Sequence, residues 1–164
     1  KRMSIPGGIN IEMVYDKVYL TAGHALEEPE DDIETVLDVP GCARLDDKTV
    51  LHARIVECCP SIDRIKGECG PELQYLDAEK TTFPLILRRW REGDRFTPLG
   101  MSSPKKVHDY FVDAKVPRAE RIRATLLCSG EDIMWIVGHR CDDRFKLTSR
   151  TGKVIAIAVK EEHD

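Results

Sequence analysis

The sequence predicts an α+β domain that is rich in strands, with β-sandwich-like sheets and a few short helices. Short apolar or alternating runs recur along the chain and are separated by turn residues, a pattern typical of strands. Only one stretch has a clear helical period. The 164 residues are 41% hydrophobic and 33% charged, as in ordinary globular proteins. A chain of this length buries a core without disulfides or metals.

Strand signals dominate the first half of the chain. Residues 9–20 predict a β-hairpin, because apolar residues alternate with polar ones on both sides of a turn. An acidic, proline-containing loop is expected at 23–32, and two further strands are expected at 33–38 and 49–57. Residues 60–71 are rich in Pro and Gly and predict a loop with one helical turn. This loop is the candidate seam between two subdomains.

The second half opens with a short apolar strand at 84–87. A helix is predicted from Ser103-Pro104 to about Lys115, because serine caps helix N-termini and proline suits the first helical position. Pro117 disfavours its continuation. Its buried stripe follows the i, i+3, i+4, i+7 spacing of Val107, Tyr110, Phe111 and Ala114.

The remaining elements are short. Residues 118–123 predict a small basic helix. Apolar runs at 126–128, 133–137 and 154–159 predict the closing strands, and the run at 133–137 is typical of a strand buried on both faces.

The cysteines and apolar runs exclude several classes of protein. No C-x-x-C pair occurs, so a zinc site is disfavoured. Reduced thiols, most of which pack as small apolar side chains, are expected among Cys42, Cys58, Cys59, Cys69, Cys128 and Cys141. No run approaches the about 20 apolar residues of a membrane span, and the start at Lys1 has no export signal. We therefore expect a cytoplasmic protein, of which this chain is a fragment.

The net charge of −4 hides an asymmetry. Residues 1–82 carry 9 basic and 17 acidic side chains, whereas residues 83–160 carry 16 basic and 9 acidic ones. We interpret 1–164 as one domain with an acidic, strand-rich part and a basic part that favours a polyanionic partner.

No catalytic site is predicted. The sequence has no phosphate-binding P-loop and no G-x-G-x-x-G motif. A hydrolase that uses Cys128 or Ser129 with His139 is one interpretation of these side chains, but ordinary packing of these residues is favoured. The carboxylates in predicted turns are expected to be solvated or to cap the turns.

Arginines and lysines interleaved with Trp90 and Phe96 are the better candidates for a binding site, because guanidinium groups bind two phosphate oxygens at once. Lys105 and Lys106 are expected in the first turn of the predicted helix, where free N–H groups favour anions. On composition alone, a solvated surface with local salt bridges, such as Arg144 with Asp142, is slightly favoured. Trp90 is expected either to stack on a base or to pack on the core.

Residues 83–148 closely resemble the C-terminal domain of tRNA(Ile)-lysidine synthetases, once labelled MesJ-type cell-cycle proteins. The family pattern R-x-G-D-R-x-x-P-x-G matches Arg91, Gly93, Asp94, Arg95, Pro98 and Gly100. The family's two-lysine helix before a proline matches Lys105, Lys106, Phe111, Asp113 and Pro117. Its closing signature matches Trp135, Val137, Gly138, Arg140, Asp142, Arg144 and Phe145. Residues Ile5–Gly8 match an upstream LPGG-like segment of the family more loosely. Thr125 and Cys141 depart from the usual proline and isoleucine at packing or turn positions.

The resemblance implies a module also found in the phenylalanyl-tRNA synthetase β chain, which holds tRNA and carries no cofactor. It implies that the whole enzyme is an ATP-dependent ligase with an N-terminal PP-loop domain, which this chain lacks. That domain, with ATP and the expected Mg²⁺, adenylates C2 of the wobble cytidine of tRNA(Ile) with a CAU anticodon. Free lysine then displaces AMP. The fragment alone is expected to be inactive.

The resemblance also points to site residues. Gly93 and Asp94 are expected to build a turn, and Trp135 and Phe145 to lie in the core. The expected tRNA contacts are Arg88, Arg89, Arg91, Arg95, Lys105, Lys106, Arg118, Arg121, Arg140 and Arg144. The alternative function is a docking module that contacts its own catalytic domain or, in a homodimer, a second subunit, through the acidic half.

Overall fold

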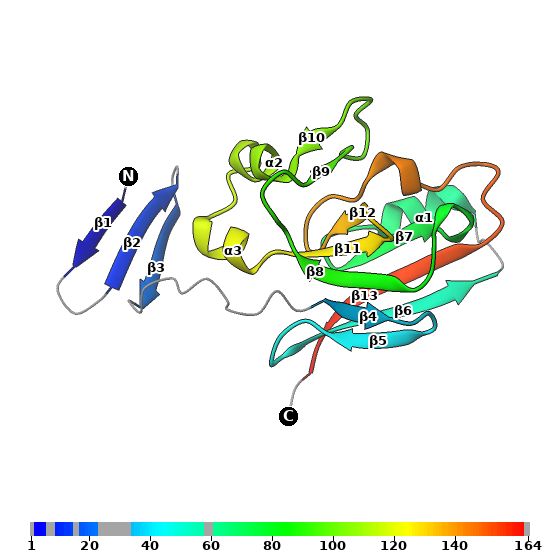
Figure 1. Cartoon of the computed structure of the whole chain (residues 1–164), viewed down its shortest axis with the longest axis horizontal. Coiled ribbons are helices and arrows are strands. Elements are labelled where there is room, and N and C mark those ends of the chain that lie inside the picture. Colours follow the sequence, from blue (N-terminus) through cyan, green and yellow to red (C-terminus); the bar gives the residue numbers. More distant parts are fainter. Residues whose placement is uncertain (1, 6–8, 15–16, 23–33, 58–60, 163–164) are drawn as a thin grey trace.

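Two four-stranded antiparallel sheets face each other and form a sandwich (Figure 1). This is a computed structural model, and it describes residues 2–5, 9–14, 17–22, 34–57 and 61–162. The predicted loop at 23–32 and the pair Cys58-Cys59 lie outside these residues. The strand-rich α+β fold class is confirmed. Within the described residues, no helix is long and apolar enough to cross a membrane.

The N-terminal strands form a sheet of their own. Strands β1 (Arg2–Ile5), β2 (Ile9–Val14) and β3 (Lys17–Ala22) pair antiparallel in that order. The predicted hairpin corresponds to β2 and β3, in which Ile9 pairs with Ala22 and Val14 with Lys17. The first strand was not predicted.

The central sheet has the strand order β12-β11-β8-β4. Its strands are β4 (Thr35–Leu37), β8 (Leu85–Arg89), β11 (Thr125–Ser129) and β12 (Asp132–Ile136). Apolar side chains cover both of its faces, and residues 133–136 are all buried. The prediction that this strand is buried on both faces is therefore confirmed.

The outer sheet has the order β5-β6-β13-β7. Its strands are β5 (Gly41–Arg44), β6 (Thr49–Val56), β7 (Leu73–Asp77) and β13 (Val154–Glu161). Sequence analysis missed β5 and β7, which are edge strands. Their composition is mixed, and pairing with β6 and β13 fixes them as strands.

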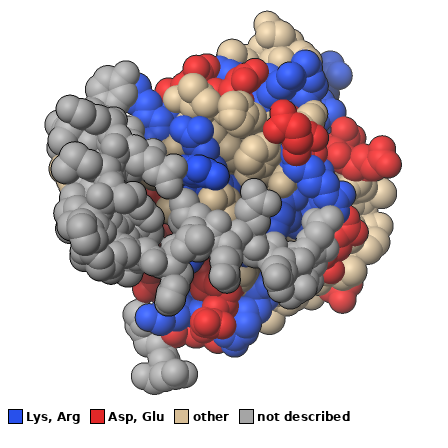
Figure 2. All heavy atoms as spheres, turned by 60° about the vertical axis from the view of Figure 1, so that its left-hand side comes forward, with Lys and Arg blue, Asp and Glu red and all other residues tan. Residues whose placement is uncertain are grey.

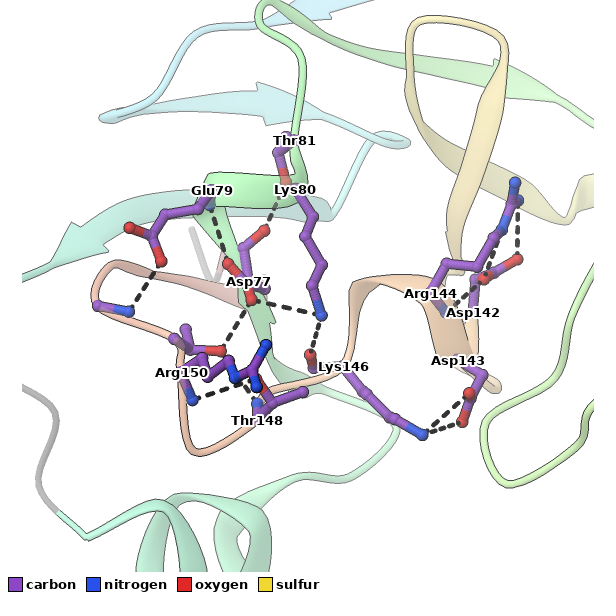
Figure 3. Close-up of polar contacts among 12 residues, drawn as sticks. Asp77, Glu79, Lys80, Thr81, Asp142, Asp143, Arg144, Lys146, Thr148 and Arg150 are labelled. Carbon is purple, nitrogen blue, oxygen red and sulfur yellow. Dashed lines mark hydrogen bonds and ion pairs between the residues drawn. The ribbon is translucent and has the colours of Figure 1, made fainter.

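The main core lies between the two sheets. Leu37, Leu85, Leu127 and Trp135 of the central sheet pack with side chains of the outer sheet such as Leu51, Leu76 and Ile155. Trp135 and Phe145 are buried as predicted. Phe145 is the last residue of η2 (Asp143–Phe145), and η1 (Ala78–Lys80) follows β7. Figure 3 shows Asp77 hydrogen-bonded to the chain around η1, and its Oδ2 also accepts from the Thr151 hydroxyl at 2.8 Å.

A second cluster covers the other face of the central sheet. Helix α2 (Val107–Asp113), helix α3 (Arg118–Arg123) and a ribbon of β9 (Arg95–Phe96) and β10 (Lys105–Lys106) lie on this side. The cluster contains Phe96, Val107, Phe111, Val116 and Ile136. The predicted span of α3 is confirmed.

The predicted start of α2 is wrong. Lys105 and Lys106 pair with Phe96 and Arg95 in the ribbon, so their backbone is extended, and the helix begins at Val107. The Val107 N–H donates to the Asp94 carbonyl at 2.9 Å. Tertiary pairing thus outweighs the local capping signal. These lysines therefore do not lie in a helical first turn, and no free N–H groups of such a turn accompany them as predicted.

Helix α1 (Ile62–Glu68) covers part of the outer sheet. Its Ile65 packs with Leu147 and Val154. The helix is longer than the single turn predicted for 60–71, and this segment joins β6 to β7, which flank the same strand, β13. The acidic and basic halves also interleave, because β4 pairs with β8 and β6 pairs with β13.

Candidate nucleic-acid interface

Arg88 is an internal ion-pair partner. Its guanidinium makes two hydrogen bonds of 2.8 Å to the carboxylate of Asp94, and its side chain is only 11% exposed. Burial by itself raises the pKa of Asp94, but the hydrogen bonds from Arg88 and from the Arg91 N–H outweigh burial and hold the pKa below its ordinary value. Such a guanidinium is unavailable to a ligand.

Asp94 also builds the turn that the family pattern predicts. Its carboxylate accepts the Arg91 N–H at 2.7 Å, and its own N–H donates to the Arg91 carbonyl at 3.1 Å. Gly93 has a φ of +92°, a conformation that L side chains rarely adopt. The expected turn-building role of Gly93 and Asp94 agrees with this geometry.

Arg89, Trp90 and Arg121 join α3 to the central sheet. Arg89 donates to the Arg123 carbonyl and, at 3.1 Å, to the Thr125 hydroxyl. The indole N–H of Trp90 donates to the Arg121 carbonyl at 2.6 Å, and the Arg121 Nε donates to the Val116 carbonyl at 2.6 Å. The Arg123 and Arg121 carbonyls at the end of α3 therefore accept hydrogen bonds from the side chains of Arg89 in β8 and of Trp90, which follows β8.

Trp90 packs rather than presenting a free ring. Its ring lies edge-on to Phe111, with the centroids 5.6 Å apart, and tilted against His108 at 6.3 Å. Between the two interpretations that the sequence leaves open, the geometry favours packing on the second cluster.

Arg144 belongs to a carboxylate network that fixes the ribbon. Its guanidinium binds both oxygens of the fully buried Asp142 at 3.0 Å and Asp132 at 2.9 Å. Asp142 also accepts the Thr97 N–H at 2.8 Å. The neighbouring Asp143 accepts the Gly100 N–H at 3.0 Å and pairs with Lys146. Figure 3 shows both aspartates with their basic partners. The predicted Arg144–Asp142 pair is present.

Two further candidates pair at the surface. The Arg91 guanidinium contacts Glu34 at 3.2 Å, although Glu34 lies far away in the sequence. Lys105 Nζ contacts the Asp113 carboxylate. Exposed pairs of this kind are weak, so these side chains can exchange partners at low cost.

The remaining candidates are exposed and form no ion pair with any side chain that the structure describes. We define the basic surface as Arg95, Lys106, Arg118 and Arg140. The first two are directly opposite each other in the ribbon, so their side chains emerge on the same face.

Aromatic residues behind the ribbon connect it to the turn that carries Arg140. Tyr110 packs edge-on against Phe96, with centroids 5.3 Å apart, and against His139 at 6.2 Å. Ribbon, helix and the turn at 138–140 therefore form one packed unit.

Charge is mixed over the described part of the face that Figure 2 draws. Figure 2 shows Lys and Arg side chains in several groups with Asp and Glu side chains between them. Pairs such as Arg88–Asp94 and Arg144–Asp142 form within residues 83–160, so they neutralise individual side chains but leave the excess of basic residues in this segment unchanged. Sequence reasoning missed the Arg91–Glu34 and Arg144–Asp132 pairs, because the partners are 57 and 12 residues apart in the sequence.

The geometry gives no support to a hydrolase. Burial raises the pKa of the Cys128 thiol to about 11, so the thiol is protonated at neutral pH. The Ser129 hydroxyl accepts the Thr82 N–H at 2.7 Å. The His139 ring packs edge-on against Tyr110 and Phe111, and burial lowers its pKa. In the part of the chain that the structure describes, no three His, Cys, Asp or Glu side chains are grouped to hold a metal.

Comparisons with known proteins agree with the sequence resemblance. Residues 85–157 match the family model described as the TilS substrate C-terminal domain. The chain is similar to tRNA(Ile)-lysidine synthases, with 48% identity over 90 residues to that of Parabacteroides distasonis, covering 55% of this chain and 20% of the relative. The tRNA(Ile)-lysidine synthase of Caldanaerobacter subterraneus is 29% identical over 161 residues, which cover 98% of this chain and 33% of the relative. The chain thus spans a fifth to a third of these relatives.

A solved structure has the same fold. The crystal structure of a TilS C-terminal domain superposes with a TM-score of 0.65 and 24% identity, covering 80% of this chain and all of that one. The β-sandwich with a few short helices is therefore the fold of that domain.

The buried Arg88–Asp94 pair yields a stability prediction. Asp94→Asn leaves the Arg88 guanidinium without its counter-charge, so we expect the free energy of unfolding to fall by about 3 kcal/mol at pH 7 in urea denaturation. Asp109→Asn, which changes an exposed carboxylate beside His108, is the matched control and should cost less than about 0.5 kcal/mol. Equal losses in the two variants would contradict the role of the pair.

The same pair predicts a pH dependence. Because the folded pKa of Asp94 is depressed, its stabilisation is present above the unfolded pKa of about 3.9 and is lost as pH falls through the folded pKa. The difference in unfolding free energy between wild type and Asp94→Asn should therefore narrow below about pH 4.

The thiols yield a labelling prediction. Cys42 is exposed, whereas Cys128 and Cys141 are buried and their pKa values are raised by burial to about 11. Iodoacetamide at pH 8, followed by peptide mass spectrometry, should label Cys42 at least about tenfold faster than either buried thiol, because only the thiolate reacts. Fast labelling of Cys128 in the folded chain would revive the nucleophile interpretation.

Proposed function

We propose that this chain, whose residues 85–157 match the family model described as the TilS substrate C-terminal domain, is the tRNA-binding, non-catalytic C-terminal part of a tRNA(Ile)-lysidine synthase. Under this proposal, the ligation of lysine to the wobble cytidine, with ATP and Mg²⁺, takes place in a separate catalytic domain of a cytoplasmic enzyme. The partners are tRNA(Ile) with a CAU anticodon and that catalytic domain.

The observation that carries the proposal is the set of exposed basic side chains on a rigid support. Arg95 and Lys106 emerge side by side from a ribbon whose backbone is held by Asp142 and Asp143. A-form RNA is recognised mainly through its phosphates, its 2′-hydroxyls and its shape. A rigid ribbon loses little conformational entropy when it binds such a backbone.

The other basic candidates have a different role in this proposal. Arg88 and Arg144 neutralise buried carboxylates, and Arg89 holds the end of α3. We assign these side chains to positioning, so that the basic surface keeps its shape. Arg91, Lys105 and Arg121 bind protein groups in the absence of RNA, and of these the exposed Arg91 is the one best placed to turn to a phosphate.

Protein docking is the alternative, and one observation favours it. Leu99 and Met101, in the loop between β9 and β10, are 39% and 41% exposed. Neighbouring exposed apolar side chains are typical of contacts with another protein surface. The catalytic domain or a second copy of the chain would be the partner.

The first test is a salt series with a tRNA(Ile) transcript and the 164-residue chain. If the basic surface neutralises about four phosphates, log Kd should rise with log[salt] with a slope near 3. Arg95→Gln with Lys106→Gln should weaken binding and reduce the slope by about 2, or about 1 per lost contact. The control Arg150→Gln with Lys153→Gln removes the same charge from exposed sites elsewhere and should leave the slope unchanged.

No binding at low salt would overturn direct tRNA recognition by this chain and favour the docking alternative. Binding that both double variants weaken equally would point to a general effect of net charge.

Arg89 separates positioning from phosphate contact. Arg89→Lys keeps the charge but loses the planar guanidinium, whose Nη1 donates to both the Arg123 carbonyl and the Thr125 hydroxyl. We expect it to weaken tRNA binding about as much as Arg89→Ala, with the salt slope of the wild type. Binding retained by Arg89→Lys but lost by Arg89→Ala would make Arg89 a phosphate contact instead.

A further inference from the structure

The outer sheet has a second face, directed away from the core, that α1 covers in part. Arg54 of β6, Ala156 of β13 and Tyr75 of β7 are paired in one row across this face. Paired residues of antiparallel strands project their side chains to the same side. Because the middle residue is alanine, space remains between the larger side chains beside it.

A cleft of about 240 Å³ lies where α1 passes this row. Its lining residues come from β6, α1 and β7, and they are Arg54, Val56, Arg64, Ile65, Glu68 and Tyr75. Val56 and Ile65 supply apolar surface, and Tyr75 supplies an aromatic ring. An apolar cleft with a few converging polar groups is typical of small-ligand sites.

The charged groups of the cleft favour an anion. Arg54 forms no ion pair with any side chain that the structure describes, and Arg64 has a loose one, with its Nε 3.6 Å from Glu68 Oε1. The Tyr75 hydroxyl donates to Glu68 Oε2 at 3.1 Å. Two guanidinium groups against one carboxylate leave an excess positive charge. The Glu68 carboxylate is contacted by Arg64 and Tyr75, and it keeps lone pairs that can accept a hydrogen bond from another donor.

We propose that this cleft binds one nucleotide unit, with its phosphate at Arg54 and Arg64, its base against Tyr75 and Ile65, and a base amino group donating to Glu68. Forked guanidinium groups match phosphate. Unpaired bases stack on aromatic rings that line a basic groove. A carboxylate accepts the amino group of cytosine, and uracil offers no such donor. Either a free nucleotide or an unpaired nucleotide of an RNA strand would present this chemistry.

The cleft is independent of the basic surface. The basic surface lies on the second cluster, beyond the central sheet, whereas the cleft lies beyond the outer sheet, so both sheets separate the two. The inference therefore goes beyond tRNA binding by the ribbon, and either proposal can fail without the other.

The test is an NMR titration of the isotope-labelled 164-residue chain with cytidine 5′-monophosphate, uridine 5′-monophosphate and a single-stranded tetracytidylate. We expect saturable shifts at Tyr75 and Ile65, with cytidine binding more tightly than uridine. Arg54→Gln should weaken cytidylate binding about tenfold, the loss of one charge-assisted contact. Lys66→Gln, which removes a charge from α1 at a position outside the cleft lining, is the matched control.

Preference for the tetranucleotide over the mononucleotide would assign the cleft to an RNA strand, and equal binding would assign it to a free nucleotide. Tyr75→Phe should keep stacking but lose part of the preference for cytidine, because Glu68 loses one of its two holding groups. Absence of shifts at Tyr75 and Ile65 would overturn the proposal, as would equal cytidylate binding by Arg54→Gln and Lys66→Gln. Cleft binding without tRNA binding would overturn the ribbon proposal alone.

Discussion

Burial of the central sheet on both faces is the constraint on which the rest of the structure depends. The sheet packs against the outer sheet on one face and against α2 and the ribbon on the other. A charged side chain at this depth is tolerated only with a partner, since an unpaired buried charge costs several kcal/mol. Arg88 is such a side chain, and both carboxylate oxygens of Asp94 accept hydrogen bonds from its guanidinium.

That pairing has structural consequences beyond charge. It fixes the turn after β8, where Gly93 adopts a positive φ, and it places the Asp94 carbonyl to receive the N–H of Val107, the first residue of α2. The ribbon that starts at Arg95 is thereby anchored at its base, and Asp142 fixes its loop through Thr97. Several residues of the family pattern thus shape the surface, and fewer of them are free to touch a ligand.

The acidic and basic halves of the chain contribute to opposite sides of one sandwich. The basic half provides most of the central sheet and the second cluster, which packs on the face of that sheet opposite the main core. The acidic half provides three strands of the outer sheet, β5, β6 and β7. The acidic half nonetheless holds Arg54 and Arg64 beside one cleft. Net charge summed over a sequence segment therefore describes neither surface, because neutralisation depends on which side chains meet in space.

The sequence by itself determined the strand-rich class, the buried strand at 133–136, helix α3, the turn at Gly93-Asp94 and the core position of Trp135, because periodicity and turn chemistry are local properties. Only the tertiary structure decided that 41–44 and 73–77 are strands and that Lys105 and Lys106 belong to a ribbon rather than a helix.

The tertiary structure also decided which basic side chains are exposed without a described partner. Arg91 meets Glu34 and Arg144 meets Asp132 across the fold, while Arg95 and Lys106 face outward together. Ion pairing and exposure depend on distances between segments that are remote in sequence, and local patterns carry no information about those distances.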